Sequence, residues 1–527
     1  MKKLPIGIQT FSEIRGKNYI YVDKTKYVHK LVTDGKVYFL SRPRRFGKSL
    51  LISTLKELFK GNKKLFNGLF IHDKWNWEEK YPVIHLDFGE LRYNTPEKLE
   101  NTLNDFINSK AREYDIKLYN SELTNRFSEL IKETNKKFKK KVVILIDEYD
   151  KAIIDCMKDI EIAKKNRDIL SEFYQVLKAN DGHLKFIFLT GVTKFSKTSI
   201  FSGLNNLSDT TLNHKYANIC GYTQYELENC FRDYIAKFSE DNEINCESLL
   251  SLIKEWYNGY SWDGKNRLYN PYSILSLFEA GEFANYWFES GTPSFLMDFI
   301  KNNKGLGVLF KEETRISGMF PSFNLEKLDF TTLLLQTGYL TIKNKEIKVG
   351  ELTKYDLAIP NKEVSDSLFI SIISEFSSQN SEEIEVLAKK ILDAIYNLDN
   401  DSLQEIFDVL VASIPAITYG NIKKDIREEN YQIWFLSWFK LMGFLVIAEV
   451  QGSKGTPDMV FIKDKLAMIC EFKYSLDEKL EKLAMKAINQ INNKQYYKPY
   501  LNYEKIILLG IAFGDREVKS IITEFKP

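Results

Sequence analysis

Hydrophobic positions in the first part of the chain follow two different spacings. Residues 37–40 form a short apolar run, which is typical of a buried strand, whereas residues 50–59 repeat apolar side chains at helical spacing. Mainly apolar runs also lie at 81–88, 142–146 and 184–189. The run at 142–146 is uninterrupted, as expected for a central parallel strand covered on both faces. The pattern predicts an α/β domain built on a parallel sheet.

The rest of the chain follows other patterns. Residues 97–140 are strongly charged and helical in pattern, and we expect a solvated helical layer there. Residues 224–410 are mostly helical in pattern and include an aromatic-rich segment at 256–273. From about residue 413 the pattern becomes that of a compact α/β unit. We therefore expect three parts: an N-terminal α/β domain at 1–223, a helical lid or linker region at 224–412, and a small α/β domain at 413–527.

Composition narrows the class of protein. A chain of 527 residues is too long for one hydrophobic core. Its 74 basic and 72 acidic residues leave a net charge of +2, so any nucleic-acid surface would have to be local. Five scattered cysteines without a CxxC pair argue against disulfides and a zinc ribbon, and favour the cytoplasm. We expect no signal peptide and no membrane span, because the apolar runs are too short.

A tight basic loop joins the first strand to the following helix. The loop reads RPRRFGKS over residues 42–49, so the helix opens on Gly47, Lys48 and Ser49. A helix N-terminus presents free N–H groups and a partial positive charge to an anion. Lys48 would reach the β- and γ-phosphates of a nucleotide, and the Ser49 hydroxyl would sit on Mg²⁺. The loop departs from the standard GxxxxGK[ST] pattern, because Arg42 occupies the position of the first glycine.

Two carboxylates, Asp147 and Glu148, follow the apolar run at 142–146. In an open α/β sheet ligands bind at the carboxyl ends of the strands. Asp147 would hold Mg²⁺, directly or through water, and Glu148 would polarise the attacking water. A solvated acidic turn is the alternative interpretation. The residues that we expect to bind the nucleotide are Arg44, Arg45, Phe46, Gly47, Lys48, Ser49, Leu50 and Asp147.

Three features of the first two parts have two interpretations each. The aromatic-rich segment 256–273 either stacks nucleic-acid bases or packs on neighbouring helices. The pair Asn270-Pro271 fits an N-cap and first helical position, which favours packing. Arg267 is a candidate arginine finger, in cis or in trans. Asp23 and Lys24 either approach the nucleotide or form a turn and a helix start.

A second group of charged residues lies in the C-terminal part. Glu471 and Lys473 share one face of an expected strand, because strand side chains alternate. A hairpin would bring Asp458 beside Glu471, and two adjacent carboxylates are costly unless a cation lies between them. Mg²⁺ or Mn²⁺ would suit that position. Lys473 would orient or deprotonate a metal-bound water that attacks a phosphodiester, and Glu429 would add a ligand. A hairpin with solvated charges is the alternative.

These motifs resemble known families. The stretches IGIQTF at 6–11, YVDKT at 21–25 and LSRPRRFGKSLLISTLKELF at 40–59 resemble the bacterial AAA-ATPase-like family, which joins a P-loop NTPase domain to a C-terminal nuclease-like domain. Pro457-Asp458 with Glu471-Phe-Lys473 resembles the PD-(D/E)XK nuclease superfamily, including its helix–strand–hairpin order. The resemblance implies ATP and Mg²⁺ as cofactors, with Mn²⁺ as an alternative to Mg²⁺ at the nuclease site. It implies the catalytic residues Glu148, Glu429, Asp458, Glu471, Lys473 and Gln490, and the metal ligands Ser49, Asp147, Asp458 and Glu471.

The function expected from the sequence is ATP binding and hydrolysis coupled to Mg²⁺-dependent cleavage of DNA or RNA, with DNA favoured over RNA. The ATP state would gate the nuclease by moving the helical middle region, and the chain would form a homo-oligomer. The alternative is a nucleotide-switched nucleic-acid-binding or assembly protein without cleavage activity, acting in defence or in mobile-element biology. Metal-dependent product formation would separate the two.

Overall fold

The computed structural model of the protein describes residues 1–194, 200, 204, 206–287, 314–317, 329–377, 379–413, 434–448, 457–514 and 517–526. The chain divides into two compact units. The first comprises residues 1–295 and 315–363, and the second comprises residues 296–314 and 364–527. Within the described residues, no helix is both long and apolar enough to cross a membrane.

The first unit is built on a five-stranded parallel sheet, as the apolar runs predict. Its strands are β1 (Val37–Ser41), β2 (Val83–Asp87), β3 (Val142–Asp147), β4 (Leu184–Gly191) and β5 (Ser208–Asp209), in the order β2-β3-β4-β1-β5. Every residue of β3 is buried, which explains its uninterrupted apolar sequence. Since all strands run the same way, the basic loop after β1 and the carboxylates after β3 emerge at one edge of the sheet.

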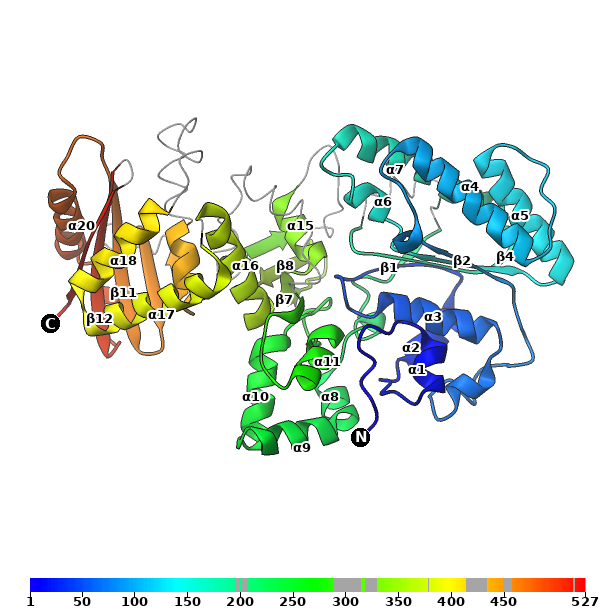
Figure 1. The fold of residues 1–527 in the computed structure, drawn as a ribbon, viewed down its shortest axis with the longest axis horizontal. Coiled ribbons are helices and arrows are strands. Elements are labelled where there is room, and N and C mark those ends of the chain that lie inside the picture. Colours follow the sequence, from blue (N-terminus) through cyan, green and yellow to red (C-terminus); the bar gives the residue numbers. More distant parts are fainter. Residues whose placement is uncertain are drawn as a thin grey trace. The chain divides into compact units, whose positions relative to one another are not determined.

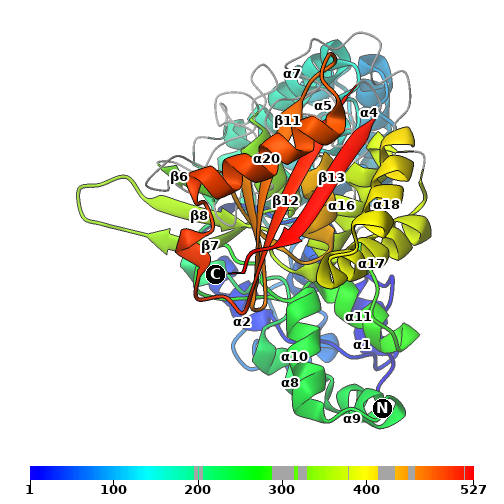
Figure 2. The same cartoon turned by 90° about the vertical axis from the view of Figure 1, so that its left-hand side faces the viewer.

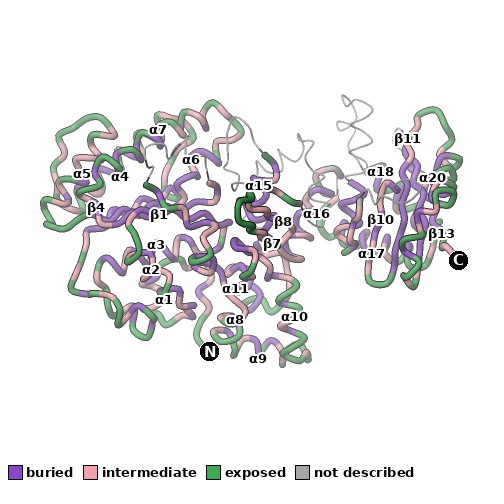
Figure 3. Tube along the Cα trace, turned by 180° about the vertical axis from the view of Figure 1, so that it is seen from behind, coloured by how far each residue is buried: buried purple, intermediate pink, exposed green. Residues whose placement is uncertain are grey.

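Helices cover both faces of this sheet (Figure 1). One face carries α4 (Pro96–Glu113), α5 (Leu123–Phe138) and α7 (Ile160–Ala179), and the other carries α1 (Phe11–Gly16), α2 (Thr25–Asp34) and α3 (Lys48–Phe59). The helix α3 buries Leu51, Leu55 and Leu58, which recur at helical spacing. Figure 3 shows the resulting layers, with the buried sheet between helices whose outer faces are exposed.

The remainder of the first unit is mainly helical. It contains α8 (Gln224–Cys230), α9 (Arg232–Asp241), α10 (Cys246–Tyr257), α11 (Pro271–Ala280) and α15 (Phe330–Thr337). A three-stranded sheet of β6 (Thr314–Ser317), β8 (Lys354–Ala358) and β7 (Thr341–Glu346) is added to these helices, and the helical pattern did not predict it. The segment 256–273 packs inward, because Tyr257, Tyr260, Trp262 and Tyr269 are buried. The Asn270 side chain caps α11 by accepting a hydrogen bond from the backbone N–H of Tyr272.

The helix α16 (Lys362–Phe376) leads into the second unit, which contains a five-stranded mixed sheet. Its strands are β9 (Leu445–Ala448), β10 (Met459–Lys463), β11 (Leu466–Tyr474), β12 (Lys505–Phe513) and β13 (Val518–Glu524), in the order β13-β12-β11-β10-β9. Only the β11–β12 pairing in this order is parallel. Its helices include α17 (Ser381–Asn397), α18 (Asn400–Ala412) and α20 (Leu480–Lys494), and Figure 2 shows α20 lying across the strands.

Two amide side chains of α18 bind the backbone of the edge strand β13. Asn400 donates to the carbonyl of Ile522 and accepts from its N–H, both at 2.9 Å. Gln404 donates to the Val518 carbonyl at 2.8 Å and accepts from the Ser520 N–H at 2.9 Å. Because these amides occupy the polar groups of an edge strand, α18 closes that edge of the sheet much as another strand would.

Candidate nucleotide and nuclease sites

The basic loop places its lysine inside the first unit. Arg45 and Gly47 have left-handed backbone angles, with φ of 66° and 88°, and these two residues turn the chain from β1 into α3. The Lys48 ammonium is buried and donates to the carbonyls of Arg42 and Pro43, both at 2.9 Å. Burial lowers the pKa of Lys48, whereas nearby carboxylates that include Asp147 act in the opposite direction.

The carboxylates after β3 are tied to the end of β4. Asp147 accepts hydrogen bonds from the Thr190 hydroxyl at 2.5 Å and from the Glu148 N–H at 3.0 Å. Asp150 accepts from both the N–H and the hydroxyl of Thr193, each at 2.6 Å. Burial raises the pKa of Asp150, although its hydrogen bonds with Thr193 favour the charged form. The two strand ends are therefore cross-linked where the expected metal ligand Asp147 emerges.

Glu148 has a left-handed backbone with a φ of 53°, which is strained for a residue with a side chain. Its carboxylate contacts the ammonium of Lys151, the first residue of α6 (Lys151–Ile154), at 2.9 Å. Strained backbones concentrate at functional sites. The predicted water-polarising residue therefore has an unusual backbone and a cationic neighbour that the sequence patterns did not indicate.

A third carboxylate, Asp87, belongs to this group and was missed in the sequence. It ends β2, directly opposite Asp147 in the parallel register. A Cβ atom on Gly89 would lie 3.0 Å from an oxygen of Asp87 and 3.3 Å from an oxygen of Glu148, so both carboxylates border the same small space. Burial, together with the charges of Asp147 and Glu148, raises the pKa of Asp87 to about 6. The sequence does contain a signal for Asp87: like Asp147, it is a carboxylate at the end of a mainly apolar run.

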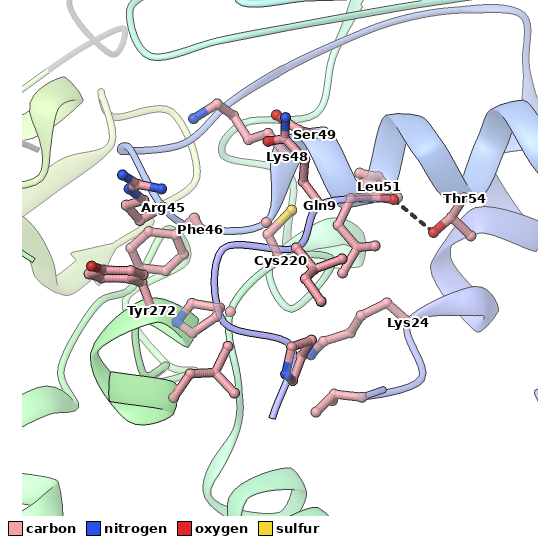
Figure 4. Close-up of a pocket in the computed structure, with 18 of the residues that line it drawn as sticks. Gln9, Lys24, Arg45, Phe46, Lys48, Ser49, Leu51, Thr54, Cys220 and Tyr272 are labelled. Carbon is pink, nitrogen blue, oxygen red and sulfur yellow. Dashed lines mark hydrogen bonds between the residues drawn. The ribbon is translucent and has the colours of Figure 1, made fainter. Parts of the chain in front are cut away.

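A cavity of about 390 Å³ extends from the loop into the first unit (Figure 4). It is lined by Glu148, by Lys151, by the N-terminal residues Pro5 and Gln9, and by other residues that include Tyr272. Most of the expected nucleotide-binding residues lie along it: Arg44, Arg45, Phe46, Gly47, Lys48, Ser49 and Leu50. Asp147 does not line the cavity and lies behind it, buried at the end of β3.

Two other candidate residues have structural partners. Lys24 lines the cavity, and its ammonium contacts both oxygens of Glu226 at 2.6 and 2.8 Å. Burial lowers the pKa of Lys24, and the charge of Glu226 opposes that shift. Arg267 does not line the cavity and donates to the backbone carbonyls of Ile342 and Lys343. The structure therefore gives Arg267 a role in anchoring β7 and offers no support for an arginine finger in cis.

The C-terminal candidates meet across the β10–β11 hairpin of the second unit. Asp458 precedes Met459, which pairs with Cys470, so Asp458 lies beside Glu471 as the sequence predicts. An oxygen of Asp458 accepts from the Phe472 N–H at 2.8 Å. One oxygen of Glu471 contacts both the Lys473 ammonium, at 2.8 Å, and the side-chain amide of Gln490 on α20. The hairpin and α20 thus assemble four of the five C-terminal candidates.

Burial raises the pKa of Asp458 and that of Glu471. Glu471 is only 2% exposed. Oxygen ligands of this kind suit Mg²⁺ and Mn²⁺. Within the described residues no group of three or more His, Cys, Asp or Glu side chains has the spacing of a metal site. Glu429, which we expect to add a ligand, lies outside the described residues, so two carboxylates remain as the donors that the structure places together.

Comparisons with known proteins match two segments of the chain to known families. Residues 5–201 match the family model described as a predicted AAA-ATPase, of the AAA-ATPase-like type, and residues 426–523 match that of the PD-(D/E)XK nuclease superfamily. A protein of Azotobacter chroococcum mcd 1, described as "Uncharacterized protein in vnfD 5'region", is 36% identical over 524 residues, which cover 99% of this chain and 98% of the relative. The chain belongs to the AAA-ATPase-like family with a C-terminal PD-(D/E)XK domain.

Both sites of this AAA-ATPase-like protein lie inside the matched segments. The basic loop, Asp87, Asp147 and Glu148 fall within residues 5–201. The segment 426–523 contains Asp458, Glu471, Lys473 and Gln490, together with Glu429. The matches associate the N-terminal site with an ATPase-type family and the C-terminal site with a nuclease superfamily, which agrees with the resemblance seen in the motifs.

Proposed function

We propose that this AAA-ATPase-like protein binds and hydrolyses ATP with Mg²⁺ in its first unit. We propose further that its PD-(D/E)XK domain cuts nucleic-acid phosphodiesters with Mg²⁺ or Mn²⁺, with DNA favoured over RNA. The observation that carries the proposal is the cavity that Lys48, Ser49 and Glu148 line together. A phosphate-binding helix N-terminus and a water-polarising carboxylate are the two parts that phosphoryl transfer to water requires.

In the first unit, the backbone N–H groups of the loop and the Lys48 ammonium would hold the β- and γ-phosphates. Lys48 already binds two backbone carbonyls of the loop, and it would exchange these neutral acceptors for phosphate oxygens. Bound Mg²⁺ would neutralise charge on the phosphates, with Ser49 and Asp147 as its protein donors. Glu148 would orient the attacking water. Charge stabilisation and positioning supply most of the catalysis in this reaction class.

In the second unit, Asp458 and Glu471 would hold the metal ion, which lowers the pKa of a bound water and thereby supplies the nucleophile. Burial raises the pKa of each carboxylate, because the charged form is poorly solvated there. A bound cation would stabilise both charged forms, so the pair is suited to hold one. Lys473 would hold the attacking water and Gln490 would fix the orientation of Glu471.

The second candidate function is nucleotide-switched binding of nucleic acid without cleavage, including assembly into an oligomer when nucleotide binds. One observation favours it: one oxygen of Glu471 already binds both the Lys473 ammonium and the Gln490 amide, so protein groups alone can balance this carboxylate. This alternative retains the nucleotide site and a nucleic-acid partner but removes the cleavage reaction.

The deciding experiment measures cleavage of single- and double-stranded DNA and RNA in Mg²⁺ or Mn²⁺, with and without ATP. Wild type is compared with Asp458→Ala and with Lys48→Ala. We expect cleavage that Asp458→Ala abolishes, and ATP hydrolysis that Lys48→Ala abolishes. A wild-type protein that binds nucleic acid without forming product would support the binding alternative. A cleavage rate that does not respond to ATP, ADP or Lys48→Ala would refute the coupling of the two sites.

A further inference from the structure

Arg42 is a buried arginine directly behind the loop that would hold the phosphates. It is fully buried, and its guanidinium donates to the carbonyls of Ser41 at 2.8 Å, Thr211 at 2.9 Å and Tyr216 at 3.3 Å. The guanidinium also lies over the ring of Trp262, 4.1 Å from its centre. It does not line the cavity, so it cannot touch a nucleotide bound there.

All of these partners are electrically neutral. No ion pair among the described residues includes Arg42, and its Nε atom has no hydrogen-bond partner among them. Two acids attract it from a distance: Asp209, which is paired with Lys194 at 2.6 Å, and Asp263, which accepts hydrogen bonds from the N–H groups of Lys265 and Asn266. Burial lowers the pKa of Arg42 to about 10, so the side chain remains charged at neutral pH. A buried charge without a counter-charge is a costly arrangement that proteins rarely keep.

The backbone does not explain the choice of residue at this position. Arg42 occupies the place of the first glycine in a standard phosphate-binding loop, but the left-handed residues of this loop are Arg45 and Gly47. The N–H of Arg42 bonds to the carbonyl of Gly191 at 3.2 Å and continues the pairing of β1 with β4. Its own carbonyl accepts from Lys48. The carbonyl of Arg42 thus contacts Lys48, while its guanidinium binds the chain after β5 and lies over Trp262.

We propose that Arg42 is a positioning residue that supplies a buried counter-charge for the nucleotide phosphates and makes the site prefer the triphosphate over the diphosphate. This inference rests on the proposed nucleotide function of the same site. The charge acts through a low-dielectric layer of protein, where Coulomb interactions are strong and salt screens them weakly. A bound polyanion would add negative charge near a guanidinium that has no direct ion pair among the described residues.

A purely structural clamp would make a different prediction. If Arg42 only fastened β1 to the chain after β5 through the carbonyls of Thr211 and Tyr216, its loss would weaken the binding of every nucleotide by a similar factor. If the charge of Arg42 contributes to binding, the loss of affinity caused by its removal grows with the negative charge of the nucleotide. A comparison of MgATP with MgADP separates the clamp explanation from the charge explanation. Both ligands contain adenosine, and MgATP carries one more negative charge.

The experiment measures dissociation constants of MgATP and MgADP for the full chain by calorimetry, with thermal melts to verify folding. Arg42→Gln removes the charge and keeps a hydrogen-bond donor, whereas Arg42→Lys keeps the charge and removes the planar fork. Arg267→Gln is the matched control, because Arg267 also binds two backbone carbonyls but lies away from the cavity. We expect Arg42→Gln to lower the preference for ATP over ADP by roughly three- to tenfold.

Arg42→Lys should keep that preference within about twofold of wild type, and Arg267→Gln should leave both constants unchanged. The loss of preference in Arg42→Gln should persist between low and high salt, since the charge is buried. An unchanged preference in folded Arg42→Gln, or an equal loss in Arg42→Lys, would overturn this inference alone. Wild type that binds neither nucleotide would overturn the proposed function and this inference together.

Discussion

The ammonium of Lys151 lies 2.9 Å from an oxygen of Glu148, and both residues line the cavity beside the basic loop. The pair restrains a carboxylate whose backbone already adopts a left-handed angle. A carboxylate that must orient water has to point in one direction, and an ion pair with a neighbour on a short helix provides that restraint. The geometry therefore gives Lys151 a positioning role next to the predicted reaction centre.

Replacement of Lys151 by Met should lower kcat for ATP hydrolysis by about ten- to a hundredfold, because the orientation of Glu148 is lost. The KM for ATP should change by less than about threefold, since nucleotide binding depends on the loop around Lys48. Steady-state phosphate release measures both constants. Lys164→Met is the matched control, because Lys164 makes the same pair with Glu161 at 2.9 Å on the surface of α7. An equal loss in both variants would contradict the positioning role.

The sequence predicts those parts of the fold that depend on local patterns. The strand, loop and helix around Lys48 follow from an apolar run, a basic turn and helical spacing. The same local rule places Asp147 at the end of β3, and strand alternation brings Asp458 beside Glu471. In each case the residue and the pattern that positions it lie close together in the chain.

The residues that were missed depend on pairings between distant segments. Asp87 lies beside Asp147 only because β2 pairs with β3. The sequence of a single strand does not indicate which strand will be its neighbour in the sheet. The partner of Lys24, Glu226, lies 202 residues further along the chain. The burial of Arg42 depends on Trp262 and on the turn after β5. Patterns within one segment carry no information on such contacts. The role of Glu429 as a further metal ligand stays a prediction, because this residue lies outside the described residues.

Substitution of Asp87 by Asn should raise the Mg²⁺ concentration needed for half-maximal ATP hydrolysis by about three- to tenfold. The reason is that three carboxylates share one edge of the sheet, and each adds to the attraction for a cation there. A magnesium titration at saturating ATP measures the shift. Glu78→Gln, an exposed change on the segment that leads into β2, is the control and should leave the titration unchanged. A normal magnesium requirement in Asp87→Asn would exclude Asp87 from the cation site.

Glu363 should make the protein less stable as pH rises. It is fully buried and accepts hydrogen bonds from the Ser273 hydroxyl and the Trp287 N–H, and burial raises its pKa from 4.5 to about 8. Between these two pH values the folded state keeps a proton that the unfolded state has lost. The stability that this proton provides is complete below pH 4.5 and is lost as pH rises to about 8.

Glu363→Gln, which is neutral at every pH, should therefore be more stable than wild type at pH 9 by roughly 2–4 kcal/mol. The two proteins should melt at similar temperatures below pH 4.5, where Glu363 is mostly protonated in both states. Melting temperatures measured from about pH 4 to 9 test this difference. Glu255→Gln, an exposed change of the same kind, should follow wild type throughout. Parallel curves for wild type and Glu363→Gln would show that Glu363 is charged when folded.

Gln490 should control the metal affinity of the nuclease site through Glu471. Its side-chain amide binds the same carboxylate oxygen that Lys473 contacts at 2.8 Å, and Glu471 is nearly inaccessible to solvent. Partners of metal ligands of this kind typically contribute ten- to a hundredfold in metal affinity, because they fix the orientation of the ligand. Gln490→Ala leaves Glu471 with one donor fewer, so the carboxylate loses part of that orientation.

We therefore expect Gln490→Ala to need about ten- to a hundredfold more Mn²⁺ for half-maximal cleavage, with a smaller effect on the rate at saturating Mn²⁺. A Mn²⁺ titration of cleavage measures both quantities, and the rise in melting temperature with Mn²⁺ measures affinity without relying on activity. Asn489→Ala changes the exposed neighbour on the same helix and should behave as wild type. If Gln490→Ala lowers the saturating rate at an unchanged Mn²⁺ requirement, Gln490 acts on substrate or water and the metal is held without it.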